Sequence, residues 1–340
     1  MDAHKKSKWE EIMIVLPKGP IGVGLVGVGR HGSRYARYLA KDVPGAVLAA
    51  ICRKRVEEQL PFDNVSVYGD FRDLIADPRV HAVVVVTSPL LCHDICLEAV
   101  RAGKPVLVEK PLAFNGAQAR SMVAEADRAS VPLMTAQTMR FDPTILKLKE
   151  QLGLIGRLQT VTLRSHIETK ANVLSDHGTP VSLGALLELG IHMLDLVRFA
   201  TGEEVARVQA VLVPPADEGP EQAVQARMLT AEGIECLLDV ARVEGRRQGW
   251  SEWVGSEGML RADWCCRTVR YTDRHGESTE WIVEPEPTVL AVLMAFIRAI
   301  RDGVPPPITG ADGCRAVELA DACYRSSETG GAWMDVASLD

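Results

Sequence analysis

Lys110 is the first residue whose type and position could do chemistry. It lies in the segment VLVEKPLA, two residues after an apolar run that predicts a buried strand over Pro105–Val108. The carboxyl ends of the strands in an open α/β sheet form the edge where ligands bind. A lysine held in a closed, partly desolvated crevice has a lowered pKa and exchanges protons near neutrality. Lys110 is therefore a candidate acid/base residue, and the alternative is a surface lysine in a loop.

A second group of ionisable residues lies in the segment LLELGIHMLDLVRF, residues 186–199. On a helix, Glu188, His192 and Asp195 occupy positions i, i+4 and i+7 and share one face. Carboxylates beside an imidazole can orient it, and such a stripe is suited to binding hydroxyl groups. The alternative is a solvated polar face on which Asp195 pairs with Arg198. Nothing in this spacing demands a metal ion.

The segment GLVGVGRHG contains a glycine pattern that predicts a dinucleotide site. Gly27, Gly29 and Gly32 form G-x-G-x-x-G between an apolar run, 21–28, and a helix-compatible run, 33–40. In such a turn the first glycine permits the bend, the second lets the backbone approach a pyrophosphate, and the third lets the helix pack on the strand. The helix N-terminus then supplies N–H groups to the phosphates. The other residues of the turn that we expect to contact the cofactor are Val28, Arg30 and His31. An ordinary βα turn is the alternative.

Positive charge follows the second predicted strand, Val47–Cys52. Arg53 and Lys54 come about 20 residues after the last turn glycine, where NAD-preferring folds place an acidic residue on the ribose 2′-hydroxyl. No acidic residue appears between this strand and Glu57. The forked donors of arginine suit a 2′-phosphate. The sequence therefore predicts NADP as the preferred cofactor, with NAD as the alternative, and a solvated basic turn is the other interpretation.

Strand and helix patterns alternate over residues 21–142. The plainest strand is Val80–Thr87, and helices are expected at 94–102 and 118–129. Repeated strand–helix units imply a parallel, doubly wound sheet, so we expect a Rossmann dinucleotide-binding domain over 21–142. Residues 1–20 are charged, have too short an apolar part for a secretory signal, and are expected to form an N-terminal extension.

The pattern changes past Asp142. An antiparallel strand is expected over 158–167 and a helix over 183–201, followed by strand after strand over 205–283. We therefore expect an α+β substrate-binding and oligomerisation domain over 143–340, in which helices cover one face of a large, mostly antiparallel open sheet. The other face must be covered, so a homodimer or homotetramer through this sheet is expected. The last two helices are expected at 287–300 and 312–327.

Length and composition exclude several classes of protein. A chain of 340 residues suits two domains, and a formal net charge of −7 argues against a nucleic-acid binder. The chain contains no run of about 18 apolar residues, so no membrane span is expected. The eight cysteines contain no C-x-x-C pair, which favours reduced, buried thiols in a cytoplasmic protein. Cys92 and Cys96 are four residues apart, but other converging ligands are missing, so no metal site is expected.

With these residues in view, the chain resembles the Gfo/Idh/MocA family, named for glucose–fructose oxidoreductase, inositol dehydrogenase and rhizopine catabolism. The resemblance runs from about residue 21 to the end. The E-K-P step and the later G-x-H-x-x-D are its most specific parts. It rests on GLVGVGRHG, GKPVLVEKPLA (103–113), MRFDP (139–143), GLIG (153–156), ELGIHMLDLVRF (188–199) and PITG (307–310).

The resemblance implies an NAD(P)-dependent oxidoreductase that moves a hydride between C4 of the nicotinamide and a carbinol carbon of a sugar, cyclitol or related polyol. It implies that Lys110 and His192 are the acid/base residues, with Glu188 at a position where the family generally has Asp. The residues expected along the ribose and nicotinamide are Thr87, Ser88, Pro89, Glu109 and Lys110. The residues expected to border or bind the substrate are Arg140, Glu188, His192 and Asp195.

Two other functions are compatible with this resemblance. One is a non-catalytic, nucleotide-bound sensor or regulator, and the other is a lyase or glycosidase driven by transient oxidation. The presence of both Lys110 and His192 favours chemistry over sensing. Substrate selectivity depends on loops such as Glu168–Pro180, whose sequence contains no readable signature.

Overall fold

The computed structural model describes residues 18–57, 61–168, 183–214 and 219–336. The chain forms two compact units. The first comprises Met1–Gln137 and Pro287–Cys314, and the second comprises Thr138–Glu286 and Arg315–Asp340. Of the expected N-terminal extension, residues 1–17 lie outside the described part, as does most of the 168–180 loop.

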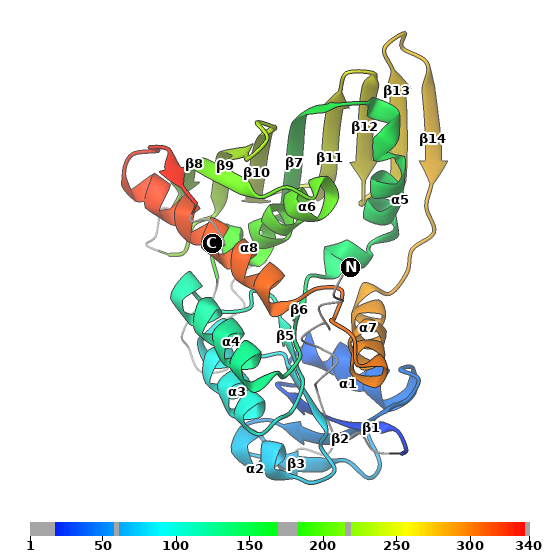
Figure 1. Cartoon of the computed structure of the whole chain (residues 1–340), viewed down its shortest axis with the longest axis vertical. Helices are drawn as coiled ribbons and strands as arrows, with labels where there is room; N and C mark the ends of the chain where they lie inside the picture. Colours follow the sequence, from blue (N-terminus) through cyan, green and yellow to red (C-terminus); the bar gives the residue numbers. More distant parts are fainter. Residues whose placement is uncertain (1–17, 58–60, 169–182, 215–218, 337–340) are drawn as a thin grey trace, which may run out of the picture. The chain divides into compact units, whose positions relative to one another are not determined.

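The first unit is built on a six-stranded parallel sheet with the order β3-β2-β1-β4-β5-β6 (Figure 1). This is the strand order of a dinucleotide-binding Rossmann fold, as predicted. Four strands, β1, β4, β5 and β6, are buried over their whole length, which explains their near-continuous apolar sequences. The bounds are β1 Ile21–Val26, β2 Ala46–Cys52, β3 Ser66–Tyr68, β4 Ala82–Val85, β5 Val106–Glu109 and β6 Leu133–Ala136.

Helices of the first unit begin where the sequence offers caps. Asn115 accepts a hydrogen bond from the Gln118 N–H at the start of α4, and Asp70 caps α2 in the same way through Arg72. Helix α3 begins at Pro89, five residues before the predicted start at Asp94, because proline is favoured in the first helical turn. The bounds are α1 Gly32–Lys41, α2 Phe71–Ala76, α3 Pro89–Arg101, α4 Gly116–Ala129 and α7 Thr288–Asp302.

The division of the chain differs from the expected one, because Pro287–Cys314 belongs to the first unit rather than to a continuous second domain. Helix α7 packs on α1. Arg301 of α7 donates hydrogen bonds to the carbonyl oxygens of Gly45 (2.7 Å) and Gly19 (3.2 Å). An amphipathic pattern shows that a helix has a buried face but does not show which core it covers.

The second unit contains a nine-stranded sheet with the order β14-β13-β12-β11-β7-β10-β9-β8-β15. It is mostly antiparallel, as predicted. One pair differs, because β7 is antiparallel to β11 but parallel to β10. The bounds are β7 Leu158–Glu168, β8 Val205–Val213, β9 Ala223–Thr230, β10 Glu235–Val243, β11 Gln248–Gly255, β12 Gly258–Asp263, β13 Thr268–Asp273, β14 Ser278–Ile282 and β15 Met334–Asp335.

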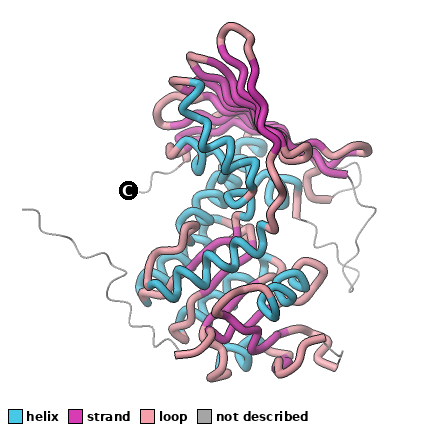
Figure 2. Tube along the Cα trace, turned by 90° about the vertical axis from the view of Figure 1, so that its right-hand side faces the viewer, coloured by secondary structure: helices cyan, strands magenta, loops and turns pink. Residues whose placement is uncertain are grey.

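Helices of the second unit lie on one side of this sheet (Figure 2). Burial alternates along the strands, so that Val161 and Leu163 of β7 are buried while Thr160 and Thr162 are not. Helix α8 starts in the first unit and continues in the second from Arg315. The bounds are η2 Thr138–Phe141, α5 Pro143–Gln151, η3 Leu152–Ile155, the π-helix η4 Leu186–Gly190, α6 Ile191–Thr201 and α8 Gly310–Glu328.

All eight cysteines lie among the described residues, and none forms a disulfide. Six are buried, in agreement with the predicted buried thiols, but Cys265 and Cys266 are exposed in the turn between β12 and β13. Among the described residues, no helix is both long and apolar enough to cross a membrane.

Candidate functional site

The glycine-rich turn joins β1 to α1. Gly27 has a φ of +93°, and a Cβ placed on it would lie 2.2 Å from the carbonyl oxygen of Val86. A Cβ on Gly32 would lie 2.1 Å from the carbonyl oxygen of Gly27. At Gly29, by contrast, no described atom outside its own chain neighbours lies within 4 Å of the Cβ position. The first and third glycines are thus required by packing, and the second leaves the backbone open to a ligand, which fits a dinucleotide pyrophosphate.

Thr87 and Ser88 follow β4 at the carboxyl edge of the parallel sheet, and Pro89 begins α3. The Oγ of Ser88 is buried and has no hydrogen-bond partner among the described residues. A buried hydroxyl of this kind requires a partner, and a ribose hydroxyl would supply one. Burial raises the pKa of the neighbouring Cys92 thiol to about 11, so this thiol stays protonated. The residues present therefore fit a nicotinamide dinucleotide.

Glu109 and Lys110 stand at the end of β5. The Glu109 side chain is only 7% exposed, and its Oε1 accepts a hydrogen bond from the Tyr35 hydroxyl over 2.7 Å. The Nε2 of His31 lies 2.7 Å from the same oxygen. Burial, and then the charge of Glu109, raise the pKa of Tyr35 well above its usual value. Lys110 is half-buried, and the peptide bond to Pro111 is cis.

Arg53 directly follows β2, whose predicted end at Cys52 is confirmed. Its backbone N–H donates to the carbonyl oxygen of Tyr68 over 3.0 Å, and the Gly27 N–H donates to the carbonyl oxygen of Cys52 over 3.0 Å. The second of these bonds ties the strand end to the glycine-rich turn. Arg53 is half-buried and Lys54 is exposed. Positive charge therefore lies directly after the carboxyl end of β2, as the sequence predicts.

Glu188 and His192 lie on either side of a change in helix type. The predicted helix is present, but η4 is a π-helical turn and α6 is α-helical only from Ile191. The expected regular α-helical spacing is therefore interrupted between the two residues. Glu188 forms an ion pair with Arg242 of β10, which also donates to the carbonyl oxygen of Leu183 over 2.8 Å. His192 is half-buried.

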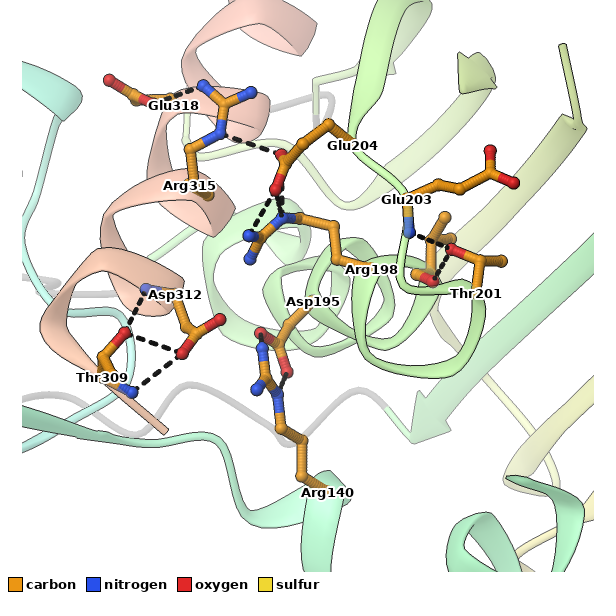
Figure 3. A network of polar contacts seen from close by, with 11 residues as sticks. Arg140, Asp195, Arg198, Thr201, Glu203, Glu204, Thr309, Asp312, Arg315 and Glu318 are labelled. Carbon is orange, nitrogen blue, oxygen red and sulfur yellow. Dashed lines mark hydrogen bonds and ion pairs between the residues drawn. The ribbon is translucent and has the colours of Figure 1, made fainter. Parts of the chain in front are cut away.

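Asp195 does not share an exposed polar face with Glu188 and His192. It is 1% exposed and accepts two hydrogen bonds from Arg140, of 2.8 and 2.7 Å (Figure 3). Arg140 is itself 9% exposed, and its guanidinium carbon lies 5.2 Å from the centre of the Phe199 ring. Arg140 lies 55 residues before Asp195 in the chain, and helix spacing cannot reveal a partner at that separation.

Arg198 pairs with Glu204, and Figure 3 shows Glu204 between Arg198 and Arg315. Burial alone raises the pKa of Glu204, but the hydrogen bonds and charges of the two arginines outweigh it and lower the pKa. Arg315 also pairs with Glu318 on the same helix. This network holds the C-terminal end of α6 within the second unit.

Sequence reasoning missed the residues that hold the other end of this helix. The Glu221 carboxylate accepts hydrogen bonds from the Leu186 N–H and the Tyr324 hydroxyl, each over 3.0 Å. Arg242 holds Glu188, as described above. No local pattern marks either residue, because each acts on a distant segment. Within the described chain, no three His, Cys, Asp or Glu side chains converge in a metal-binding arrangement.

Comparison with known proteins covers both units. A family model described as an oxidoreductase family with an NAD-binding Rossmann fold matches residues 21–137, and the model of the GFO/IDH/MocA C-terminal domain matches residues 146–261. The chain is similar to the myo-inositol 2-dehydrogenase of Thermotoga maritima, with 31% identity over 90% of this chain and 96% of that protein. It is also similar to the rhizopine catabolism protein MocA of Rhizobium meliloti, with 26% identity over 88% of this chain and 93% of that protein.

A solved structure supports the same relationship. The crystal structure of a probable dehydrogenase from Thermotoga maritima matches with a TM-score of 0.78 and 29% identity, covering 93% of this chain and 99% of that one. The family models, the full-length relatives and the two sheets agree. The chain belongs to the Gfo/Idh/MocA family of oxidoreductases.

Proposed function

We propose that this protein is an NAD(P)-dependent dehydrogenase or reductase that acts on a CH–OH group of a cyclitol, sugar or related polyol. The observation that carries the proposal is the open backbone at Gly29 in a chain that also contains Lys110 and His192. A sensor needs only the dinucleotide site, whereas the two acid/base residues serve chemistry. The relatives named as inositol dehydrogenases support a cyclitol as the first substrate to test.

A bound nicotinamide would supply the hydride acceptor or donor. In oxidation, Lys110 takes the proton of the substrate hydroxyl, and in reduction it returns that proton to the developing alkoxide. As an ammonium group it also stabilises the oxyanion. His192 is the second acid/base group, and Glu188, held by Arg242, is the carboxylate that assists it. Arg140 and Asp195, which we predicted as substrate contacts, are paired with each other.

The experiment that tests this function is a panel of cyclitols, aldoses and their keto forms, assayed with NAD and NADP in parallel. Net change in NAD(P)H absorbance with at least one compound supports a dehydrogenase. Product release without net change in NAD(P)H would instead support a cofactor-assisted lyase or glycosidase. Nucleotide binding without turnover of any compound would support a sensor.

We propose that NADP is preferred over NAD, because Arg53 and Lys54 directly follow β2 and no acidic residue occurs between this strand and Glu57. Replacing Arg53 with alanine is expected to weaken NADPH binding about tenfold, the effect of losing a charge-assisted hydrogen bond, and to leave NADH binding unchanged. Fluorescence titration with both nucleotides measures the two affinities. Wild-type protein that binds NADH more tightly than NADPH would contradict this preference.

We propose further that a second copy covers the open face of the nine-stranded sheet. Its outer face exposes Val211 and Leu237, and Trp250 is half-buried there beneath the guanidinium of Arg261 at 4.0 Å. Replacing Leu237 with lysine is expected to shift a dimer or tetramer toward monomer, as measured by sedimentation. Replacing Val47, an exposed apolar residue of the first unit, with lysine is the control.

For the location of the protein we propose the cytosol, since none of the eight cysteines is in a disulfide.

A further inference from the structure

Glu109 is a buried carboxylate that the proposed acid/base chemistry does not use. It ends β5 and directly precedes Lys110. Its two contacts, with Tyr35 and His31, come from residues 74 and 78 positions earlier in the chain, on α1 and in the turn before it. These contacts therefore join two segments of the first unit: the glycine-rich turn and the strand end that carries Lys110.

Burial makes such contacts necessary for Glu109. A carboxylate without partners in the protein interior is costly, and hydrogen bonds to it are about twice as strong as neutral ones. Tyr35 is fully buried and its pKa is raised by burial and by the charge of Glu109, so its hydroxyl keeps the proton that it donates. Tyr35 thus binds the Glu109 carboxylate from the interior of the first unit.

His31 holds the carboxylate from the solvent side. Its side chain is 47% exposed, and its ring meets the Tyr35 ring edge-on, with 5.6 Å between ring centres. His31 lies within the glycine-rich turn, two residues after Gly29, where the backbone is open to a phosphate. Gly29 is exposed, and its carbonyl oxygen accepts hydrogen bonds from the N–H and the hydroxyl of Ser33 on α1, each over 2.9 Å. These bonds tie the turn to its own helix, whereas the contact between His31 and Glu109 ties it to the end of β5.

We propose that His31 is a positioning residue whose contact with Glu109 fixes the glycine-rich turn in its dinucleotide-binding conformation and in register with Lys110. A turn that is held in place before binding loses less conformational freedom when the dinucleotide binds, so the affinity is higher. The proposal rests on the dinucleotide-binding part of the proposed function and is independent of the substrate.

Fluorescence titration of the full-length protein with NADH and NADPH tests this role. We expect His31→Ala to raise the dissociation constants about tenfold, the size expected for one hydrogen bond to a charged group. His31→Gln retains an N–H donor and is expected to recover most of the affinity. His93→Ala is the matched control, because His93 also lies in the first unit beside a carboxylate, with Nδ1 at 3.0 Å from Asp94, and is outside the turn. The control is expected to bind as the wild type does.

Amide hydrogen exchange of the ligand-free protein gives a second measurement. His31→Ala is expected to speed exchange in residues 29–34 while the strands of the sheet keep their protection. Unchanged exchange in the turn, or an affinity of His31→Ala equal to that of the His93 control, would overturn the proposal. The proposed function would survive that result. Absence of NADH and NADPH binding by the wild type would overturn both.

Discussion

Replacing Lys110 with alanine is expected to lower kcat at least about a hundredfold, because general acid–base catalysis by one positioned side chain contributes about that much or more. The cofactor should still bind, since the open backbone at Gly29 and the buried Ser88 hydroxyl remain. Steady-state kinetics with the best substrate of the panel measures kcat, and fluorescence titration measures cofactor affinity. A large loss in kcat with little change in affinity identifies a group that acts on the reaction rather than on binding.

Lys104 provides the matched control for this substitution. It precedes β5, while Lys110 follows that strand, and its ammonium group donates to the carbonyl oxygen of Asp77 over 3.1 Å. Burial lowers the pKa of Lys104, so a perturbed lysine alone does not mark the reactive one. Lys104→Ala should reduce stability and leave kcat near the wild-type value. Unchanged turnover in Lys110→Ala would refute its assignment as an acid/base residue.

The strands of the second unit show what a sequence pattern can predict. Strands β8 to β14 all fall within the predicted run of strands over 205–283, because a strand with one buried face alternates apolar and polar residues and this period is visible locally. The short β3 and α2 show no recognisable pattern in the sequence, since three and six residues are too few to show a period. The parallel pairing of β7 with β10 depends on segments far apart in the chain and leaves no local trace.

Part of the candidate site was also predictable from the sequence. The roles of Gly27 and Gly32 follow from the motif, and the packing distances agree with them. The partners of charged residues were not predictable. Asp195 was assigned to a polar stripe by helix spacing, yet its partner Arg140 lies on η2. A charged residue within an apolar helix indicates that a partner exists, but only the fold identifies that partner.

Replacing Asp195 with alanine is therefore expected to lower the free energy of unfolding of the second unit by about 3–5 kcal/mol, because it removes the carboxylate that accepts two hydrogen bonds from the buried Arg140 guanidinium. Tryptophan fluorescence can follow this unit almost alone, since five of the six tryptophans, 250, 253, 264, 281 and 333, lie in it. Urea unfolding monitored in this way measures the loss. The double variant Asp195→Leu with Arg140→Met, which removes both charges, should recover most of the stability.

An exposed ion pair of the same unit supplies the control for this prediction. Arg227 and Glu235 pair across β9 and β10 at 2.7 Å, and both side chains are exposed, so Glu235→Ala should cost no more than about 1 kcal/mol of unfolding free energy.

The comparison of Asp195→Ala with this control separates two roles for Asp195. A large loss of stability with KM for the polyol unchanged in the double variant means that the pair positions α6. A loss no larger than that of the control, together with a raised KM, would mean that Arg140 and Asp195 bind substrate, as the family resemblance implies. Both side chains are buried and are paired with each other, so a ligand could bind them only by breaking that pair. Their burial therefore favours the first outcome.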